Sequence, residues 1–499
     1  GYLGSSESWA EYIWLVFRSA AIVLLPAVTI LGVIFPYLMK LSEPHMHAAG
    51  RMVGNLAAVN TLGAVVGSVA AGFWMLEWFG LWSSVRLMAG FCLIAALILG
   101  ARWLPAVGFL LILSLLDASR LPTVHYSPKT ESLLETWEGS GATVAVVRKD
   151  KSLRIKVNNF YALGSSGAAS SERFQSHLPL LVHPEPKNVF YLGMGTGITA
   201  GGSLEHDVVE KVTVTELVPD VIDASRKHFT KYLNGLFEDE RVSVVAEDGR
   251  HYLAATRESY DAIIADLFIP WRAGVGSLYT TDHYETTRER LREGGVFAQW
   301  VPMYQVTESE FSTIVATMLE VFPQVTIWRG DFFVEKPIVC ILGHRDNTPF
   351  GLDTFRERSQ AFAKKSGNEL FAGNPNVAAH LSYYCGSLRP GEAIHLPTSP
   401  ISTDDYPLLE YEAPINHRRE KAGEVQWFIG ESLVEWMGKI AKSVEEDPWM
   451  ARGSETDGIV VQSGLVLHSM KVAKADQDQS AERRAFEKFQ GLVRKLERP

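Results

Sequence analysis

Three glycines follow a short apolar run, and together they could cradle a ligand. The stretch "NVFYL" leads into Gly193, Gly195 and Gly197, and a helix is predicted directly after them. Glycine lets the backbone approach a ligand closely, and the start of a helix offers free N–H groups. A single Gly-x-Gly-x-Gly pattern is weak evidence, and it is also compatible with dinucleotide binding.

Each of the next three predicted strands ends in a carboxylate. "KVTVTEL" carries Glu216, "VSVVAEDGR" carries Asp248 followed by Gly249, and "YDAIIAD" ends in Asp266. An acid after the second strand can accept hydrogen bonds from ribose hydroxyls, and an aspartate after the third can bind an adenine amino group. One such acid alone is more often a solvated strand end or a helix cap. Their recurrence at successive strand ends favours a nucleoside pocket.

The elements that must position these residues alternate between strand and helix. This order predicts an α/β fold with a parallel sheet covered by helices on both faces. We assign residues 184–350 to this nucleoside-binding domain and residues 121–183 to a small β-region with a linking helix. Residues 351–499 read as a mostly helical C-terminal extension, whose apolar stripes would suit a partner as well as the domain itself.

The first 120 residues are strongly apolar and predict a transmembrane region, 1–120. A spanning helix needs roughly 20 apolar residues. The runs Ser19–Met39 and Asn55–Leu76 meet this length, and Leu87–Gly100 and Ala106–Leu116 are shorter. We expect three or four helices and further ones upstream of Gly1. Charge alone does not predict the orientation.

Composition excludes several classes of protein. The net charge of -10 argues against a nucleic-acid-binding surface. The three cysteines, Cys92, Cys340 and Cys385, lie far apart and match no zinc or redox spacing. We therefore expect neither a metal site nor a disulfide framework.

Several stretches together resemble the spermidine synthase (polyamine aminopropyltransferase) family. They are "HLPLLVHPEPKNVFYLGMGTG", "TVTELVPDVID", "VVAEDGR", "YDAIIAD" and "SLYTTDHYE". The stretches "PWRAGVGSLYTTDHY", "QWVPMY" and "TDDYPLLEY" are similar to the membrane-fused branch, in which a multi-span region precedes the synthase-like domain. The resemblance extends to about Pro414.

The resemblance implies a class I methyltransferase-like (Rossmann-like) fold and an S-adenosyl cosubstrate, either S-adenosylmethionine or its decarboxylated form. It makes Asp266 the base that takes a proton from an attacking amine. It assigns no chemistry to His177. The implied cosubstrate-binding residues are Gly193, Gly195, Gly197, Glu216, Asp248 and Gly249.

Two positions depart from the family pattern on the amine side. The family's glycine loop reads Gly-Gly-Gly-Asp-Gly, with Thr196 here in place of Asp, and Ile269 replaces the second acid of its Asp-x-x-Asp-Pro loop. These changes predict weaker binding of a polyamine and less repulsion of a donor that carries a carboxylate. Asp404 and Asp405 either substitute for the lost acids or cap a turn.

The sequence thus predicts a membrane-anchored transferase that alkylates an amine or a lipid-like acceptor, with a role in polyamine biosynthesis. We expect it in a bacterial inner (cytoplasmic) membrane with the catalytic domain in the cytoplasm. Four aromatic residues either line an apolar acceptor site or belong to the core: Trp271, Tyr279, Trp300 and Tyr304. The alternatives are a non-catalytic subunit of a membrane complex, with the C-terminal helices contacting a partner, and an NAD-dependent enzyme.

Overall fold

The computed structural model describes most of the chain and divides it into two compact units. Unit 1 comprises residues 1–145 and 156–161, and unit 2 comprises residues 146–155 and 162–499. The four segments expected from the sequence stay a prediction. The described residues are 9–42, 49–98, 108, 124–139, 141–158, 161–266, 268–348, 351–366, 374, 377–450 and 452–496.

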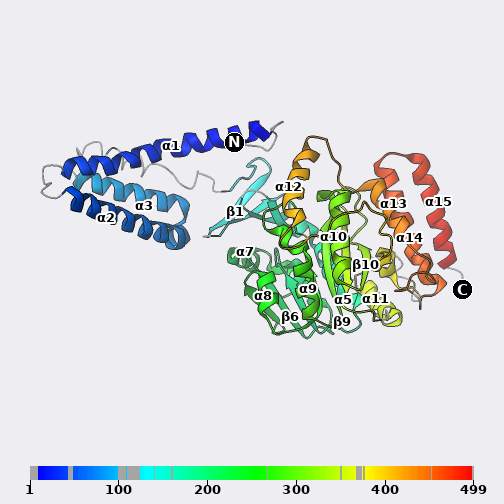
Figure 1. Ribbon diagram of the computed structural model, residues 1–499. Coiled ribbons are helices and arrows are strands. Elements are labelled where there is room, and N and C mark those ends of the chain that lie inside the picture. The colour runs from blue at the N-terminus through cyan, green and yellow to red at the C-terminus, as the bar shows by residue number, and fades with distance from the viewer. Residues whose placement is uncertain are drawn as a thin grey trace. The chain divides into compact units, whose positions relative to one another are not determined.

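Unit 1 contains long apolar helices, drawn in blue in Figure 1. Their large apolar side chains are mostly exposed. Two stretches, Ala10–Lys40 and Gly50–Ile98, are long and apolar enough to cross a membrane, by length and composition alone. Gly80, with φ of 69°, interrupts the second stretch. The expected run Ala106–Leu116 lies outside the described residues except for Gly108. The elements are α1 (Trp9–Ser42), α2 (Ala49–Ala70), the π-helical η2 (Ala71–Met75) and α3 (Leu76–Ile98).

A four-stranded meander follows, in the order β1-β2-β3-β4. In β3 buried residues alternate with partly exposed ones, as the period of a half-covered strand requires. The strands are β1 (Glu131–Glu138), β2 (Thr143–Lys149), β3 (Ser152–Val157) and β4 (Tyr161–Ser165), and the helix α5 (Ala169–Val182) follows.

The main sheet has eight strands in the order β12-β10-β11-β9-β8-β5-β6-β7. The five strands β9-β8-β5-β6-β7 run parallel, as expected. Their bounds are β5 (Asn188–Leu192), β6 (Lys211–Glu216), β7 (Val242–Ala246), β8 (Tyr260–Ala265) and β9 (Leu291–Pro302).

The prediction of an all-parallel sheet is wrong for the remaining strands. The strand β11 pairs antiparallel with both β9 and β10, and β12 pairs antiparallel with β10. The segment between β10 and β11 is too short for the crossover that parallel neighbours need, so these strands form a hairpin. The fold is therefore a methyltransferase-like α/β fold with a mixed sheet. The bounds are β10 (Gln324–Arg329), β11 (Ile338–His344) and β12 (Tyr384–Leu388).

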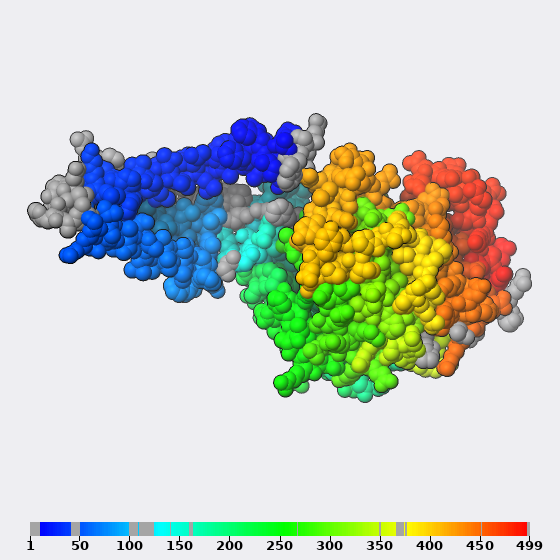
Figure 2. Space-filling view, viewed as in Figure 1, coloured from blue at the N-terminus to red at the C-terminus, as the bar shows by residue number. Residues whose placement is uncertain are grey.

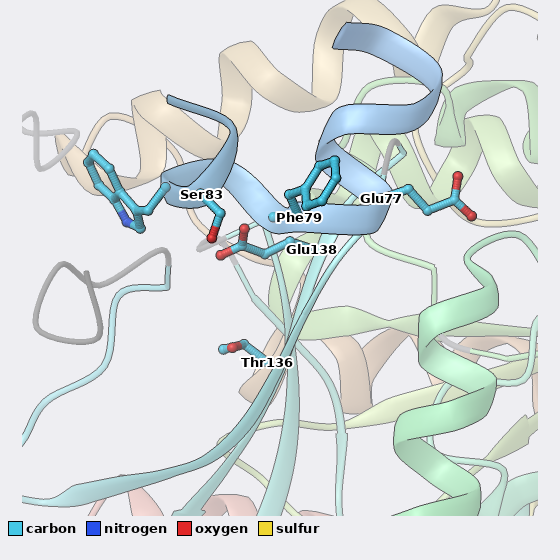
Figure 3. Close-up of a pocket in the computed structure, with 7 residues that line it drawn as sticks. Glu77, Phe79, Ser83, Thr136 and Glu138 are labelled. Carbon is cyan, nitrogen blue, oxygen red and sulfur yellow. The ribbon is translucent and has the colours of Figure 1, made fainter. Parts of the chain in front are cut away.

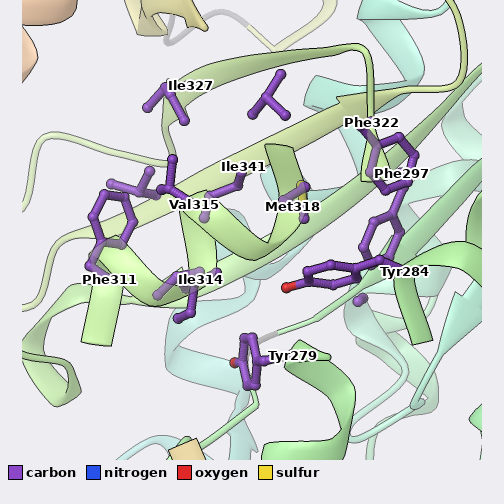
Figure 4. Packing of buried hydrophobic residues seen from close by; sticks show 14 of the residues in the cluster. Tyr279, Tyr284, Phe297, Phe311, Ile314, Val315, Met318, Phe322, Ile327 and Ile341 are labelled. Atoms are coloured by element: carbon purple, nitrogen blue, oxygen red, sulfur yellow. The ribbon is translucent and has the colours of Figure 1, made fainter. Parts of the chain in front are cut away.

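Helices pack on the sheet and bury a large apolar core. Figure 4 shows Val315 and Met318 of α10 beside Ile341 of the sheet. A capping box of Thr307 and Glu310 fixes the start of α10. The helices are α6 (Ile198–Gly202), α7 (Pro219–His228), α8 (Gly249–Ala255), α9 (Thr281–Arg290) and α10 (Glu308–Val321); the 3₁₀ segments are η4 (Ser166–Ala168), η5 (Ser203–Glu205), η6 (Thr230–Tyr232), η7 (Val275–Tyr279) and η8 (Met303–Gln305).

The C-terminal extension packs against the sheet domain within unit 2, and Figure 2 shows its yellow and orange atoms against the green ones. On α14, Gly464 lies so close to the Ser382 carbonyl and the Arg329 guanidinium that an added Cβ would collide with both. The strand β12 lies within this mostly helical region. The helices are α11 (Leu352–Ser366), the 3₁₀ segment η9 (Ala379–Tyr383), α12 (Leu408–Lys421), α13 (Gly430–Ile440), α14 (Glu455–Ala475) and α15 (Gln479–Leu496).

Candidate active site

The predicted site residues gather at one edge of the parallel strands. In the register of the sheet, Leu192 pairs with both Thr215 and Ala265, so β5, β6 and β8 end at the same level. The glycine loop therefore begins beside Glu216 and Asp266. This is the edge at which open α/β sheets bind ligands.

The glycine loop adopts a backbone conformation that favours glycine. Gly193, Gly195 and Gly197 have φ values of 91°, 54° and 81°. A Cβ at Gly193 would lie 3.5 Å from the Phe268 ring, which belongs to the segment after β8. The helix α6 that follows is only five residues long. The loop geometry, more than a long helix dipole, shapes this part of the site.

Glu216 holds the glycine loop in place. Its Oε2 accepts hydrogen bonds from the N–H groups of Met194 at 3.2 Å and Gly195 at 3.0 Å, and its Oε1 accepts one from Val218 at 3.0 Å. Burial raises the pKa of this carboxyl group, and the backbone donors oppose that rise. Oε2 already accepts two hydrogen bonds, whereas Oε1 accepts the one from Val218 and keeps a lone pair to which a ribose hydroxyl can donate.

Asp248 caps α8 and marks the third strand end. Its Oδ1 accepts hydrogen bonds from the N–H groups of Arg250 at 2.8 Å and His251 at 3.1 Å. A Cβ on Gly249 would lie 2.6 Å from the Thr215 hydroxyl, so glycine lets α8 start directly against β6. The helix cap that sequence analysis weighed for Asp248 is thus present, and its adenine-binding role stays a prediction.

Asp266 lies just past the end of β8 and is partly exposed. Its Oδ2 accepts a hydrogen bond of 2.8 Å from the hydroxyl of Thr199 on α6. This bond orients one carboxylate oxygen. An acid that is oriented and accessible to solvent is suited to accept a proton from a bound substrate.

Sequence analysis missed an acid that lies at the glycine loop, Glu172 of α5. Its Oε2 accepts a hydrogen bond of 2.6 Å from the Thr196 hydroxyl, and its Oε1 accepts one of 2.9 Å from the Ser165 N–H. Burial raises the pKa of Glu172 to about 7, and the negative charge of Asp266 contributes to that rise. The only sequence signal is that Glu172 is the one acid in α5.

A second acid beside this group also went unpredicted. Asp331 follows β10 and accepts a long hydrogen bond of 3.4 Å from Ser171, the neighbour of Glu172. Burial raises the pKa of Asp331 to about 6. The negative charges of Asp331 and Asp266 both contribute to the raised pKa of Tyr304, although burial is the main cause. Glu172, Asp266 and Asp331 therefore surround one region, which we call the amine side.

The four candidate aromatic residues divide into two pairs. Tyr279 and Trp300 are fully buried core residues. Trp271 and Tyr304 are partly exposed, and the Trp271 indole donates a hydrogen bond of 2.9 Å to Gln305. The core alternative is confirmed for Tyr279 and Trp300, and an acceptor-site role for Trp271 and Tyr304 stays a prediction.

Other residues weighed from the sequence have structural partners. His177 is buried, and its Nδ1 lies 3.0 Å from Nε2 of His206, in keeping with a packed side chain. The Asp404 carboxylate contacts Arg250 and accepts a hydrogen bond of 2.7 Å from Thr280, so it acts as a turn-capping and ion-pairing group. Ile269 is partly buried and introduces no charge.

A separate hollow lies in unit 1 and involves none of these residues (Figure 3). Its lining includes Glu138, whose carboxylate accepts a hydrogen bond from the Leu81 N–H. Among the described residues no group of three or more His, Cys, Asp or Glu could hold a metal ion. The lining residues are Glu77, Phe79, Gly80, Trp82, Ser83, Thr136 and Glu138.

Comparison with known proteins gives a family for the sheet domain. The model described as spermine/spermidine synthase domain matches residues 170–328. Residues 170–328 are therefore similar to a spermine/spermidine synthase domain. This span includes the glycine loop and all the predicted acids of the site.

Curated relatives of this domain carry the name polyamine aminopropyltransferase. The protein from Saccharolobus solfataricus is 34% identical over 170 residues, which cover 32% of this chain and 56% of the relative. The protein from Aeropyrum pernix is 32% identical over 190 residues, covering 36% of this chain and 59% of the relative. The chain thus spans somewhat more than half the length of these relatives.

Solved structures that are similar include two described as spermidine synthases. One, in complex with the transition state analogue AdoDATO, has a TM-score of 0.39 and 22% identity, covering 43% of this chain and 74% of that one. The other, a probable spermidine synthase from Corynebacterium glutamicum, has a TM-score of 0.35 and 16% identity, covering 48% of this chain and 94% of that one.

Proposed function

We propose that this spermidine synthase-like protein is a membrane-anchored aminopropyltransferase. It would take an aminopropyl group from decarboxylated S-adenosylmethionine and transfer it to an amine acceptor. The observation that carries the proposal is the hydrogen bond between Glu172 and Thr196, because it brings a carboxylate to the glycine loop beside Asp266.

The proposed nucleoside side consists of the glycine loop, Glu216 and Asp248. The loop conformation leaves its backbone open to a flat ligand, and Glu216 stabilises that conformation through three N–H groups. Glu216 would accept a hydrogen bond from a ribose hydroxyl and Asp248 one from an adenine amino group, while Gly249 keeps α8 close to β6. A donor of the S-adenosyl type fits this set of groups.

The negative charge on the amine side supports one of the two donors. Thr196 by itself suggested weaker repulsion of a carboxylate-bearing donor, but Glu172 supplies negative charge at that same position. Asp266 and Asp331 add to it. A carboxylate on the donor would be repelled here and an ammonium attracted, which favours the decarboxylated form.

The proposed reaction is a direct displacement at the carbon next to the sulfonium. The lone pair of the acceptor nitrogen forms the new C–N bond while the C–S bond breaks and its electrons remain on sulfur. The sulfonium becomes the neutral thioether of methylthioadenosine. The proton lost by the nitrogen passes to Asp266, which the Thr199 hydroxyl orients.

The apolar helices of unit 1 support the proposed membrane anchoring. Ala10–Lys40 and Gly50–Ile98 have the length and composition of spanning helices. We propose the bacterial inner membrane, with the transferase domain in the cytoplasm where S-adenosyl compounds are made. The partly exposed Trp271 and Tyr304 make a lipid-like amine an alternative acceptor.

Calorimetry on detergent-purified protein tests the donor. We expect micromolar binding of decarboxylated S-adenosylmethionine and methylthioadenosine, and weaker binding of S-adenosylmethionine. Asp248→Ala should abolish binding of all three, whereas Glu210→Gln, an exposed acid before β6, should not change it. Binding of none of the three would contradict the proposal and favour a non-catalytic subunit of a membrane complex. Preference for S-adenosylmethionine would point to transfer of a different group.

A further inference from the structure

We propose that Glu410 is a positioning residue that latches the 268–280 loop over the amine side of the site. This loop follows Asp266 closely and carries Phe268, which packs on the glycine loop at Gly193. Glu410 lies in the first turn of α12, more than a hundred residues away in the chain. The inference rests on the proposed function for its kinetic readout only.

The carboxylate of Glu410 binds the loop backbone at two points. Its Oε1 accepts a hydrogen bond of 2.8 Å from the Gly274 N–H, and its Oε2 accepts one of 3.0 Å from the Gly276 N–H. Both oxygens are therefore engaged by one short turn. Hydrogen bonds from backbone N–H groups to an ionised carboxylate are about twice as strong as neutral ones.

The backbone at Gly274 and Gly276 allows this contact. Gly274 has a φ of 85°, a left-handed conformation that lets nearby N–H groups point toward one anion. A Cβ on Gly276 would lie 2.6 Å from the Glu410 backbone nitrogen, so only glycine allows α12 to approach this closely. The two glycines thus serve the contact with α12.

A second contact from the same helix holds the start of the loop. The Trp271 ring stacks on His417, with centroids 4.1 Å apart and planes inclined by 13°. His417 lies seven residues after Glu410, which is two helical turns and hence the same face of α12. The helix itself is tied to α10 through the hydrogen bond of 3.0 Å from Asn416 to Glu310.

The 268–280 loop also contacts Arg250, but this contact is weaker because it is partly exposed to solvent. Arg250 donates to the Ser277 carbonyl at 3.0 Å and pairs with Asp404, whose side chain is 40% exposed. Ion pairs open to solvent contribute little. Trp271, Val275 and Leu278 pack against the apolar core, and Trp271 also donates to Gln305. At the turn from Gly274 to Gly276, Glu410 is the side chain that accepts hydrogen bonds from two backbone N–H groups.

The latch would affect binding of the amine acceptor more than binding of the donor. Glu410 contacts no residue of the glycine loop, Glu216 or Asp248, and the loop it holds begins at the proposed base. The contacts of Glu410 lie at Gly274 and Gly276, away from Phe268, which packs on Gly193. Loosening this turn should therefore affect nucleoside binding less than acceptor binding, because the amine would lose a fixed wall beside Asp266. The acceptor KM should rise severalfold, with less change in kcat at saturating acceptor.

The test compares Glu410→Gln and Glu410→Ala with a matched control in the full-length protein. Glu424→Gln is the control, because Glu424 lies just after α12 and pairs only with exposed Arg419 in the described structure. Amide hydrogen exchange of peptides covering 268–280 is measured together with exchange of β5, which reports on folding.

We expect at least tenfold faster exchange of the loop in Glu410→Ala and a smaller increase in Glu410→Gln, with β5 unchanged. The control should match the wild type. Unchanged loop exchange in both variants would overturn the latch, as would an equal rise in the KM of donor and acceptor. If the wild type transfers no group to any amine, the proposed function fails and loop exchange alone decides the latch.

Discussion

Both sides of the site carry carboxylates, but different kinds of element supply them. On the nucleoside side, the acids stand at the ends of successive parallel strands, and each also stabilises local backbone, as Glu216 does for the glycine loop. On the amine side, only Asp266 follows a strand of the parallel set. Glu172 comes from a helix and Asp331 from the hairpin β10–β11.

This difference teaches that charge at a site can be retained while the residues that supply it change. The register of the sheet sets where each strand ends. The positions of acids at the strand ends are therefore determined by the fold. A helix such as α5 can offer a carboxylate to the same point in space from a different part of the chain. Predictions can test how far the two sides are independent.

The largest effect is expected from Asp266→Asn, which keeps the shape and removes the base. Loss of a general base typically costs about 10²–10⁴-fold in rate. We therefore expect kcat to fall by about this factor while methylthioadenosine binds as in the wild type. An equal loss of nucleoside binding would show that the two sides are not separable.

Glu216→Ala should break the nucleoside side. The change leaves the N–H groups of Met194, Gly195 and Val218 without their acceptor, at roughly 1–3 kcal/mol for a buried unsatisfied donor. Chemical denaturation should show a loss of about 3 kcal/mol, and calorimetry a loss of nucleoside affinity. Glu210→Gln, near the start of the same strand, should behave as the wild type.

Glu172→Gln should change the pH dependence. The pKa of Glu172 is raised from 4.5 to about 7, so its charge destabilises the fold as the pH rises between these values. The variant should be more stable relative to the wild type at pH 8 than at pH 5. Affinity for the cationic donor should rise as the pH passes through 7 in the wild type only, because Glu172 then becomes charged. At pH 8 the variant should therefore bind the donor about tenfold more weakly than the wild type. Parallel profiles would exclude Glu172 from the amine side.

The smallest effect is expected from Asp404→Asn. Its partner Arg250 and the carboxylate are both partly exposed, and such pairs contribute at most about 1 kcal/mol. Stability should fall by less than that, and kcat/KM by a fewfold at most. A loss comparable to that of Asp266→Asn would place Asp404 among the residues that contact substrate.

The parallel half of the fold was predictable because its signals are local. Glu216 and Asp266 each end a short apolar run, and alternation with helices fixes which edge those ends share. The antiparallel strands β10, β11 and β12 were not predicted, because a buried apolar run looks the same in either direction. The strand β12 also lies within a region whose composition reads as helical.

The amine side was less predictable because its contacts join distant segments. Glu172 and Thr196 are separated by most of α5 and the whole of β5, and their hydrogen bond exists only once both pack at the same sheet edge. For Asp404 the sequence left both a substituting acid and a turn cap open, and the structure gives it Arg250 and Thr280 as partners. Whether such an acid can contact a substrate depends on its burial and its partners, and neither can be predicted from one segment of the sequence.

The close approach of Gly464 has a consequence for dissecting the protein. The fully buried Arg329 donates to the Ser382 carbonyl at 2.7 Å and to Cys385, and α14 covers this cation. A truncation after α12, where the family resemblance ends, would open the Arg329 site to water and strip Lys471 from the surroundings of Asp331. The helix α14 is therefore part of the sheet domain's own structure, and a protein shortened after α12 would be a poor substitute for the whole chain in crystallisation or assay.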